Sequence, residues 1–180
     1  FALMIYLPKR ALFIHIPRAA GNSITSAIAS SCAGKGIDIM VGTSSSKLNH
    51  WAKFERHIRA SVLRTVIEEW DDIFKFAIYR PEEERLISAK GLVDRDISNK
   101  VYNDPTCTDT WKKFLLSGKE EKDSYWKKFQ AMDWGYFTKS LSGDEIGVCR
   151  YNFSDLNEKW PEICDRCQIP KSDLPHLNNG

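Results

Sequence analysis

Residues 12–25 read LFIHIPRAAGNSIT and place a strand-like run, a tight turn and a helix start next to one another. The apolar run that ends at Ile16 has the length and composition of a short buried strand. Proline, alanine and glycine then favour a turn, and the following SITSAIASS has the spacing of a helix with one apolar face. We predict that this helix begins near Asn22, which can cap it, and stops at Gly34 and Gly36.

The rest of the chain repeats this alternation. Apolar runs of strand length occur at residues 11–16, 37–41, 74–79 and 146–151. Helical spacing occurs at residues 48–70, from 81 onward, at 110–116, 124–132 and 156–167. Strands that alternate with helices favour a parallel sheet with crossover helices. Because 180 residues suffice for one core, we predict a single α/β domain over residues 1–180, with a central parallel sheet flanked by helices.

Composition limits the classes of partner. Charged residues make up 28% of the chain and nearly cancel to a net charge of +2, so we expect neither a nucleic-acid nor a membrane partner. No apolar run approaches the roughly 20 residues of a membrane-spanning helix, and we expect a soluble protein. Five cysteines at scattered spacings favour a reducing compartment over a disulfide framework. The Cys164–Cys167 pair lacks a second zinc-type pair, so we expect ordinary packing there.

The turn PRAAGNS has a composition that suits an anion. N–H groups at a helix N-terminus and the helix dipole both favour negative charge, and alanine and glycine let a ligand approach the backbone. Arg18 adds a positive charge, and Ser23 and Thr25 add hydroxyl donors. A strand-to-helix corner without a ligand would look similar. The pattern is not G-x-x-x-x-G-K-[ST], which disfavours a small-molecule kinase or another P-loop phosphotransferase.

A second candidate phosphate clamp follows the strand at 74–79. Arg80 ends that strand, and Ser88 lies eight positions further along a predicted helix that starts at Pro81. Ligands of open α/β sheets bind beyond the carboxyl ends of the strands, where this guanidinium and hydroxyl could hold a phosphate. Two clamps predict a ligand with two separate phosphate groups.

These stretches resemble the motifs of sulfotransferases. LFIHIPRAAGNSI is similar to their 5′-phosphosulfate loop, usually F-I-H-I-P-K-T-A-G-T-S, and FAIYRPEEERLISA resembles their 3′-phosphate motif, F-x-x-V-R-N-P-Y-D-R-L-V-S, with Arg80, Arg85 and Ser88 at the same mutual spacing. NHWAKFERHIR resembles a histidine-containing segment of the family, and LPHLN at 174–178 resembles its late L-P-H-L-N. The matches span residues 11–178 and point to the carbohydrate-type branch.

The resemblance implies a P-loop-like sulfotransferase fold and the donor 3′-phosphoadenosine-5′-phosphosulfate (PAPS), with the desulfated product PAP and no metal. It implies that the 5′-phosphosulfate is wrapped by a set of six residues: Arg18, Ala19, Ala20, Gly21, Asn22 and Ser23. Arg18, at the position of the family's lysine, would also act in catalysis by neutralising the leaving oxygen, and Arg80 and Ser88 would hold the 3′-phosphate. The acceptor would be the hydroxyl of a small molecule or saccharide. Relatives usually continue with a further helix, so either a tail follows or the domain is minimal.

Departures from the family pattern support an alternative function. Arginine at position 18 cannot donate a proton at neutral pH as lysine can. Asn22 stands where the family usually has threonine, and Glu82, Glu83 and Glu84 would repel a polyanion unless they face solvent. The alternative is therefore a catalytically weak or inactive nucleotide-binding protein on the same fold. The expected compartment is cytoplasmic for a bacterial chain, which we favour, or the Golgi lumen for a truncated eukaryotic enzyme.

Four histidines compete for the role of the base that removes the acceptor proton. We predict His50, because it follows the second strand and matches the family's histidine segment; the alternative is a solvent-exposed histidine at a helix start. His57, seven residues on, could approach the site if its helix points inward. His15 is expected in the core or behind the site, and His176 in a donor-site or loop-ordering role.

Several tryptophans lie among lysine pairs: Trp111, Trp126 and Trp134, near Lys112/Lys113 and Lys127/Lys128. Aromatic faces for sugar rings and cations for acidic groups would suit a saccharide acceptor. The interpretation that we favour is amphipathic helices with aromatic core faces and solvated lysines. The sequence predicts neither the acceptor nor the oligomeric state.

Overall fold

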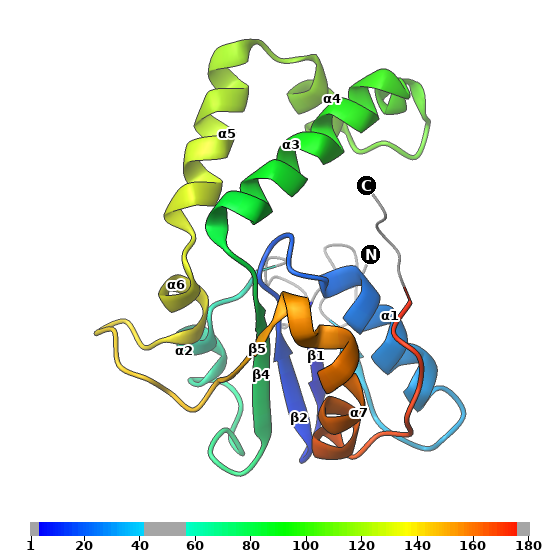
Figure 1. Cartoon of the computed structure of the whole chain (residues 1–180), viewed down its shortest axis with the longest axis vertical. Helices are drawn as coiled ribbons and strands as arrows, with labels where there is room; N and C mark the ends of the chain where they lie inside the picture. Colours follow the sequence, from blue (N-terminus) through cyan, green and yellow to red (C-terminus); the bar gives the residue numbers. More distant parts are fainter. Residues whose placement is uncertain (1–3, 42–56, 176–180) are drawn as a thin grey trace. The chain divides into compact units, whose positions relative to one another are not determined.

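The computed structural model describes residues 4–41 and 57–175, and these form two compact units (Figure 1). The first unit contains the described residues up to Arg80 and those from Trp134 onward. The second unit contains residues 81–133. The chain is a mixed α/β structure, as predicted. The predictions for His50 and His176 concern residues 42–56 and 176–180, which lie outside the described residues, as do residues 1–3.

The first unit is built on a five-stranded sheet with the order β3-β1-β2-β4-β5. Its strands are β1 (Ile5–Leu7), β2 (Ala11–Ile14), β3 (Met40–Val41), β4 (Phe74–Tyr79) and β5 (Cys149–Asn152). Its helices are α1 (Gly21–Cys32), α2 (Ala60–Leu63), α6 (Trp134–Thr138), the 3₁₀ helix η3 (Phe153–Asp155) and α7 (Leu156–Cys167).

The predicted parallel arrangement is confirmed for the neighbouring strands β2, β4 and β5. In contrast, β1 runs antiparallel to both of its neighbours, β2 and β3. A wholly parallel sheet is therefore a wrong prediction, because β1 is too short to show a strand pattern in the sequence. A turn at Pro8 and Lys9 folds it back on β2, with the Arg10 N–H donating to the Leu7 carbonyl at 3.0 Å.

The core lies where β2 and β4 pair in the centre of the sheet. Phe13 is paired in register with Phe76, and their ring centroids are 5.1 Å apart. Every residue of β2 is buried, as expected for a strand with both faces covered. Helix α7 packs on β4 and β5, and Figure 1 shows it beside α1.

The Cys164–Cys167 pair lies in α7 and belongs to this core. Both thiols are buried and free. Burial raises the pKa of each, most strongly that of Cys167, whose pKa the neighbouring Cys164 and Cys32 raise further. Thiols with a raised pKa are poor nucleophiles, so the prediction of ordinary packing is confirmed.

Two predicted elements are shorter than expected. The strand at 37–41 contains only Met40 and Val41, because Gly34 and Gly36 have positive φ and continue the turn after α1. In the predicted helical region 48–70, the described part contains α2 and then a series of turns up to Trp70. Its β-branched residues, among them Val62, have a lower helix propensity and account for the short helix.

The second unit is helical. It contains α3 (Glu82–Ser98), the 3₁₀ helix η2 (Val101–Asn103), α4 (Asp109–Leu116) and α5 (Lys119–Ala131). Helix α3 packs against both α4 and α5. The predicted helices from 81, around 110–116 and at 124–132 are therefore confirmed.

Candidate functional site

The loop between β2 and α1 begins with a tight turn. The Ala19 N–H donates to the Ile16 carbonyl at 3.3 Å, which places Pro17 and Arg18 at the centre of the turn. Arg18 has a φ of +61°. Proline followed by a residue of positive φ is typical of a type II turn, whose third position glycine normally fills. Arginine there costs about 1–2 kcal/mol of backbone strain, and such strain often marks a ligand site.

A second left-handed residue, Ala20, leads directly into α1. Ala20 has φ 60° and ψ 13°, and no side chain caps the helix. The prediction that the helix begins near Asn22 is confirmed, but Asn22 does not cap it, because Ala20 takes the cap position and Asn22 is the second helical residue. The first N–H groups of α1 therefore lack both ladder partners and a side-chain cap.

The electrostatics of this helix start favour an anion. The first turn of α1 contains no acidic residue, so no carboxylate of its own offsets the positive end of the helix dipole. Arg18 and Ala20, on either side of Ala19, both have a left-handed backbone conformation. Such an alternation of conformations points successive backbone N–H groups towards one concave surface. The loop and the first turn of α1 thus form a candidate anion site.

The start of α1 is packed on His15. A Cβ atom built on Gly21 would lie only 1.7 Å from the His15 Nε2 atom. Glycine is required at position 21 for this contact. The His15 side chain is buried, with 7% exposed, which confirms its predicted place in the core or behind the site.

Two hydroxyl side chains lie in the first turns of α1. Ser23 and Thr25 are buried, with 8% and 5% of each exposed. Thr25 Oγ1 has no hydrogen-bond partner among the described residues. Side chains of a helix lean towards its N-terminus, so this hydroxyl leans towards the turn that Gly21 begins. A buried hydroxyl without a partner costs about 1–3 kcal/mol, which an anion oxygen would relieve.

Arg80 reaches the same loop from the neighbouring strand. It follows β4, and its Nη1 atom donates to the Arg18 carbonyl at 3.2 Å. Its guanidinium also lies over the Phe153 ring, 4.3 Å from the centroid. The structure therefore brings together Arg18 and Arg80, which the sequence assigned to two different phosphate clamps.

The predicted partner of Arg80 lies in the other unit. Ser88 is a residue of α3, and the two units are described separately, so its pairing with Arg80 stays a prediction. Arg85, which shares the motif spacing, is buried with 2% exposed and donates from Nη2 to the Met132 carbonyl at 2.6 Å. Arg85 therefore joins α3 to the segment after α5.

The three glutamates of the second motif face solvent. Glu82, Glu83 and Glu84 are exposed and form the first turn of α3. Carboxylates at this end of a helix are stabilised by the dipole. They therefore have a local structural role, although their charge also disfavours an anion at the start of α3.

An aromatic and arginine cluster near the strand ends was not predicted. The Arg150 guanidinium lies 3.5 Å from the centroid of the Tyr79 ring and 5.7 Å from that of Trp134. The Tyr79 and Trp134 centroids are 6.1 Å apart. Cation–π stacking leaves the in-plane N–H groups of a guanidinium available to other acceptors. The pairing of β4 with β5 brings Tyr79 near Arg150, and α6 contributes Trp134, so no local sequence signal could have found the cluster.

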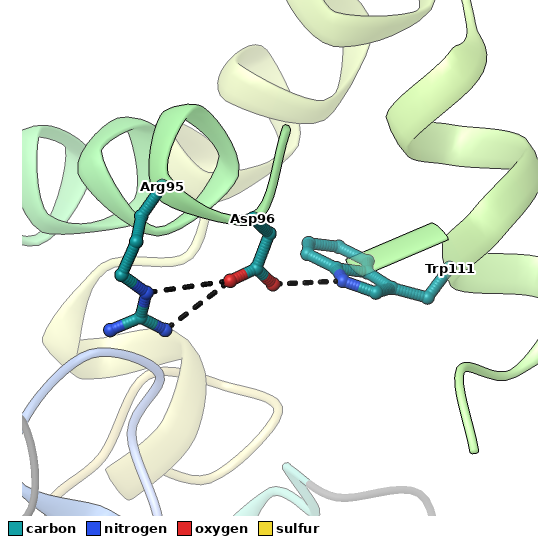
Figure 2. A network of polar contacts seen from close by, with 3 residues as sticks. All are labelled: Arg95, Asp96 and Trp111. Carbon is teal, nitrogen blue, oxygen red and sulfur yellow. Dashed lines mark hydrogen bonds and ion pairs between the residues drawn. The ribbon is translucent and has the colours of Figure 1, made fainter. Parts of the chain in front are cut away.

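The predicted aromatic faces of the second unit are packed together. The Trp111 and Phe114 centroids are 5.1 Å apart, and Tyr125 lies 4.7 Å from Phe114. Figure 2 shows Trp111 donating from Nε1 to an Asp96 oxygen at 3.1 Å, while Arg95 contacts the other oxygen of Asp96. The lysine pairs of α4 and α5 are exposed. This packing agrees with the amphipathic interpretation that we favour.

The described chain, residues 4–41 and 57–175, contains no helix with the length and apolar character needed to cross a bilayer. Within those same ranges no group of three or more His, Cys, Asp or Glu side chains is arranged to hold a metal ion. Comparisons with protein-family models, curated proteins and solved structures found no match to this chain.

Proposed function

We propose that this chain is a sulfotransferase that moves a sulfuryl group from PAPS to an acceptor hydroxyl, with a saccharide as the favoured acceptor. The observation that carries the proposal is the strained loop after β2. Arg18 and Ala20 are left-handed, Arg80 donates to the Arg18 carbonyl, and the first turn of α1 has no acid and no cap. The motif resemblance supplies the donor, and the loop geometry supports an anion of its kind.

The residues of the loop would act mainly by positioning and charge. The N–H groups of residues 20–23 would hold the 5′-phosphosulfate, and Arg18 would neutralise the bridging oxygen as it leaves. Arg80 would hold the 3′-phosphate with Ser88, as the motif implies. The predicted base, His50, belongs to this proposal.

One observation favours the second candidate, a nucleotide-binding protein with weak or no turnover. Arg18 adopts a left-handed backbone and cannot act as a proton donor as a lysine can. Such a protein would bind PAP through the same loop without transferring the sulfuryl group. The substitution Arg18→Lys introduces the lysine of the family motif and separates the two candidates. An increase in sulfuryl transfer of at least about tenfold, at unchanged PAP affinity, would favour a protein whose turnover is weakened by Arg18.

The first test is a calorimetric titration of the protein with PAP, with ATP as the competing ligand. We expect micromolar binding of PAP that ATP does not share. Arg80→Ala should weaken PAP binding at least about tenfold, since it removes a charge-assisted contact. Arg150→Ala is the matched control, because it removes an exposed arginine whose guanidinium stacks on Tyr79 rather than on the loop. No PAP binding by the folded wild-type protein would refute the proposed function.

A further inference from the structure

A cavity of about 400 Å³ lies at the start of β2, at the opposite end of that strand from the loop with Arg18. Three separate segments line it: residues 8–10, the loop after α1 at Gly36 and Asp38, and Gln168, which follows the last residue of α7. Sites for small molecules have volumes of about 300–1,000 Å³. The cavity is therefore large enough for a small organic ligand.

Hydrogen bonds hold the walls of this cavity in place. The Arg10 N–H closes the turn at its start on the Leu7 carbonyl at 3.0 Å, and the Gln168 N–H donates to the Asp165 carbonyl at 3.1 Å. The Arg10 side chain joins two of the walls, because its Nη1 atom donates to the Gln168 carbonyl at 2.6 Å. Small-molecule sites are usually preformed in this way.

The backbone around the cavity is strained at two residues. Lys9 has a φ of 60° and Gln168 a φ of 55°, whereas the left-handed conformation of Gly36, with a φ of 67°, is unstrained because glycine has no Cβ atom. Left-handed residues other than glycine gather at ligand sites more than elsewhere. The strain therefore agrees with a binding role for the cavity.

Two opposite charges line the cavity without pairing. Within the part of the chain that the structure describes, Arg10 and Asp38 form no ion pair within 4.0 Å, either with each other or with another residue. Lys9 differs, because the Glu69 carboxylate already accepts from its N–H at 3.2 Å. The cavity thus has one guanidinium and one exposed carboxylate that both lack a counterion.

Each of these two groups has capacity for a ligand. The Gln168 carbonyl takes one N–H of the Arg10 guanidinium, and the remaining N–H groups can bind both oxygens of a carboxylate. The Asp38 carboxylate can accept from an ammonium group. The carboxyl end of α7, where Gln168 lies, adds negative potential that also favours a cation.

We propose that this cavity binds a small zwitterion, a molecule that carries both a carboxylate and an ammonium group, of which a free amino acid is the simplest example. Its carboxylate lies on Arg10 and its ammonium group on Asp38. A ligand with only an anionic group would leave Asp38 without a counterion, and a ligand with only a cationic group would leave Arg10 without one. The proposal is independent of the sulfotransferase function, since the cavity and the candidate anion site lie at opposite ends of β2.

A series of ω-amino acids tests the pairing of charges. Glycine, β-alanine, γ-aminobutyrate and ε-aminocaproate are titrated at low ionic strength into the ¹⁵N-labelled full chain, and acetate and methylammonium are the controls with a single charge. We expect the backbone amide signals of Arg10 and Gln168 to shift and saturate with at least one amino acid. That amino acid should bind at least about tenfold more tightly than either control, because two charge-assisted contacts form in place of one.

The same titration gives the results that would overturn the proposal. If no member of the series shifts these signals, or if acetate binds as tightly as the best amino acid, the cavity is not a zwitterion site. Neither result depends on whether the protein binds PAP. A failure of the proposed function therefore leaves this test unchanged.

Two variants locate the contacts. Asp38→Asn keeps the size of the side chain but removes the counterion of the ammonium group, and we expect affinity for the best amino acid to fall at least about tenfold. Arg10→Lys keeps the charge but cannot bind two oxygens in one plane, so a loss of about fivefold is expected. Asp94→Asn, which changes an exposed carboxylate of α3 in the other unit, is the matched control and should bind as the wild type does. Unchanged affinity in Asp38→Asn would refute the proposed pairing.

Discussion

Strand β2 has a proline and a basic residue in a tight turn at each end, and the two turns have different consequences. At its start, Pro8 and Lys9 form a turn closed by the Arg10 N–H and the Leu7 carbonyl at 3.0 Å. At its end, Pro17 and Arg18 form a turn closed at 3.3 Å. Lys9 has φ 60° and Arg18 has φ 61°. The same local sequence thus gives the same local turn.

What differs is the structure that braces each turn. The Lys9 N–H donates to the carboxylate of Glu69, which also accepts from the Tyr6 hydroxyl. The first turn therefore joins two antiparallel strands and is supported by an acid. The Arg18 carbonyl instead accepts from Arg80, and a second left-handed residue follows before α1. Only the second turn therefore has a carbonyl that is hydrogen-bonded by an arginine side chain, that of Arg80, and a helix N-terminus without a side-chain cap, and both features favour an anion.

The strongest change should come from the helix that follows the second turn. Gly21→Ala places a Cβ atom 1.7 Å from His15 Nε2, so one of the two residues must move. We expect the free energy of unfolding to fall by about 3 kcal/mol or more, measured by urea denaturation. Gly91→Ala in α3 is the control, since a Cβ atom there would meet nothing within 4 Å and alanine favours a helix. Equal stability of the two variants would contradict the packing of His15 on Gly21.

Replacing each basic residue with glycine tests whether the two turns differ in function. Lys9→Gly and Arg18→Gly both relieve a left-handed side chain, and we expect each to raise the free energy of unfolding by about 0.5–1 kcal/mol. Only Arg18→Gly should weaken PAP binding, by about tenfold, because it removes a charge from the candidate site. Calorimetry with PAP and thermal unfolding measure the two effects. An equal loss of PAP affinity in Lys9→Gly would refute the distinction between the turns.

A smaller change is expected from adding an acid to the open helix start. Asn22→Asp gives α1 a carboxylate in its first turn, which should stabilise the helix by about 0.3–1 kcal/mol through the dipole. The same charge should repel an anion, so we expect PAP affinity to fall about fivefold while thermal stability rises slightly. The isosteric substitution leaves size unchanged. Unchanged PAP affinity at low ionic strength would indicate that the anion does not bind at this helix start.

The smallest effect is expected at Glu69, whose carboxylate accepts hydrogen bonds at the first turn. The hydrogen bond from Tyr6 lowers the pKa of Glu69, with a further contribution from the backbone N–H of Lys9. A carboxyl with a lowered pKa in the folded state stabilises the protein above its unfolded pKa and loses that contribution as pH falls through the folded pKa. Tyr6→Phe should therefore lower Tm by about 2 °C at pH 7, and the difference should shrink in acid. A difference that grows in acid would contradict this assignment.

Much of the architecture could be predicted because local patterns carry it. The apolar run up to Ile16 and the helix after Gly21 follow from composition and spacing, as do α3, α4, α5 and α7. Strand β1 escapes prediction because three residues, Ile5–Leu7, are too few for a periodic signal and their pairing depends on the turn at Lys9. The predicted cap lies two residues too late, because asparagine is a common cap, whereas the strained loop makes Ala20 the cap.

Short-range sequence alone specifies the strand and helix on either side of the loop, and the residue types that suit an anion. These features depend on the composition and spacing of neighbouring residues, which is why they could be predicted without a structure. Long-range packing was needed to place Arg80 on Arg18 and His57 on His15. These contacts join residues 62 and 42 positions apart, and the pairing of β2 with β4, which no local pattern specifies, brings the first pair together.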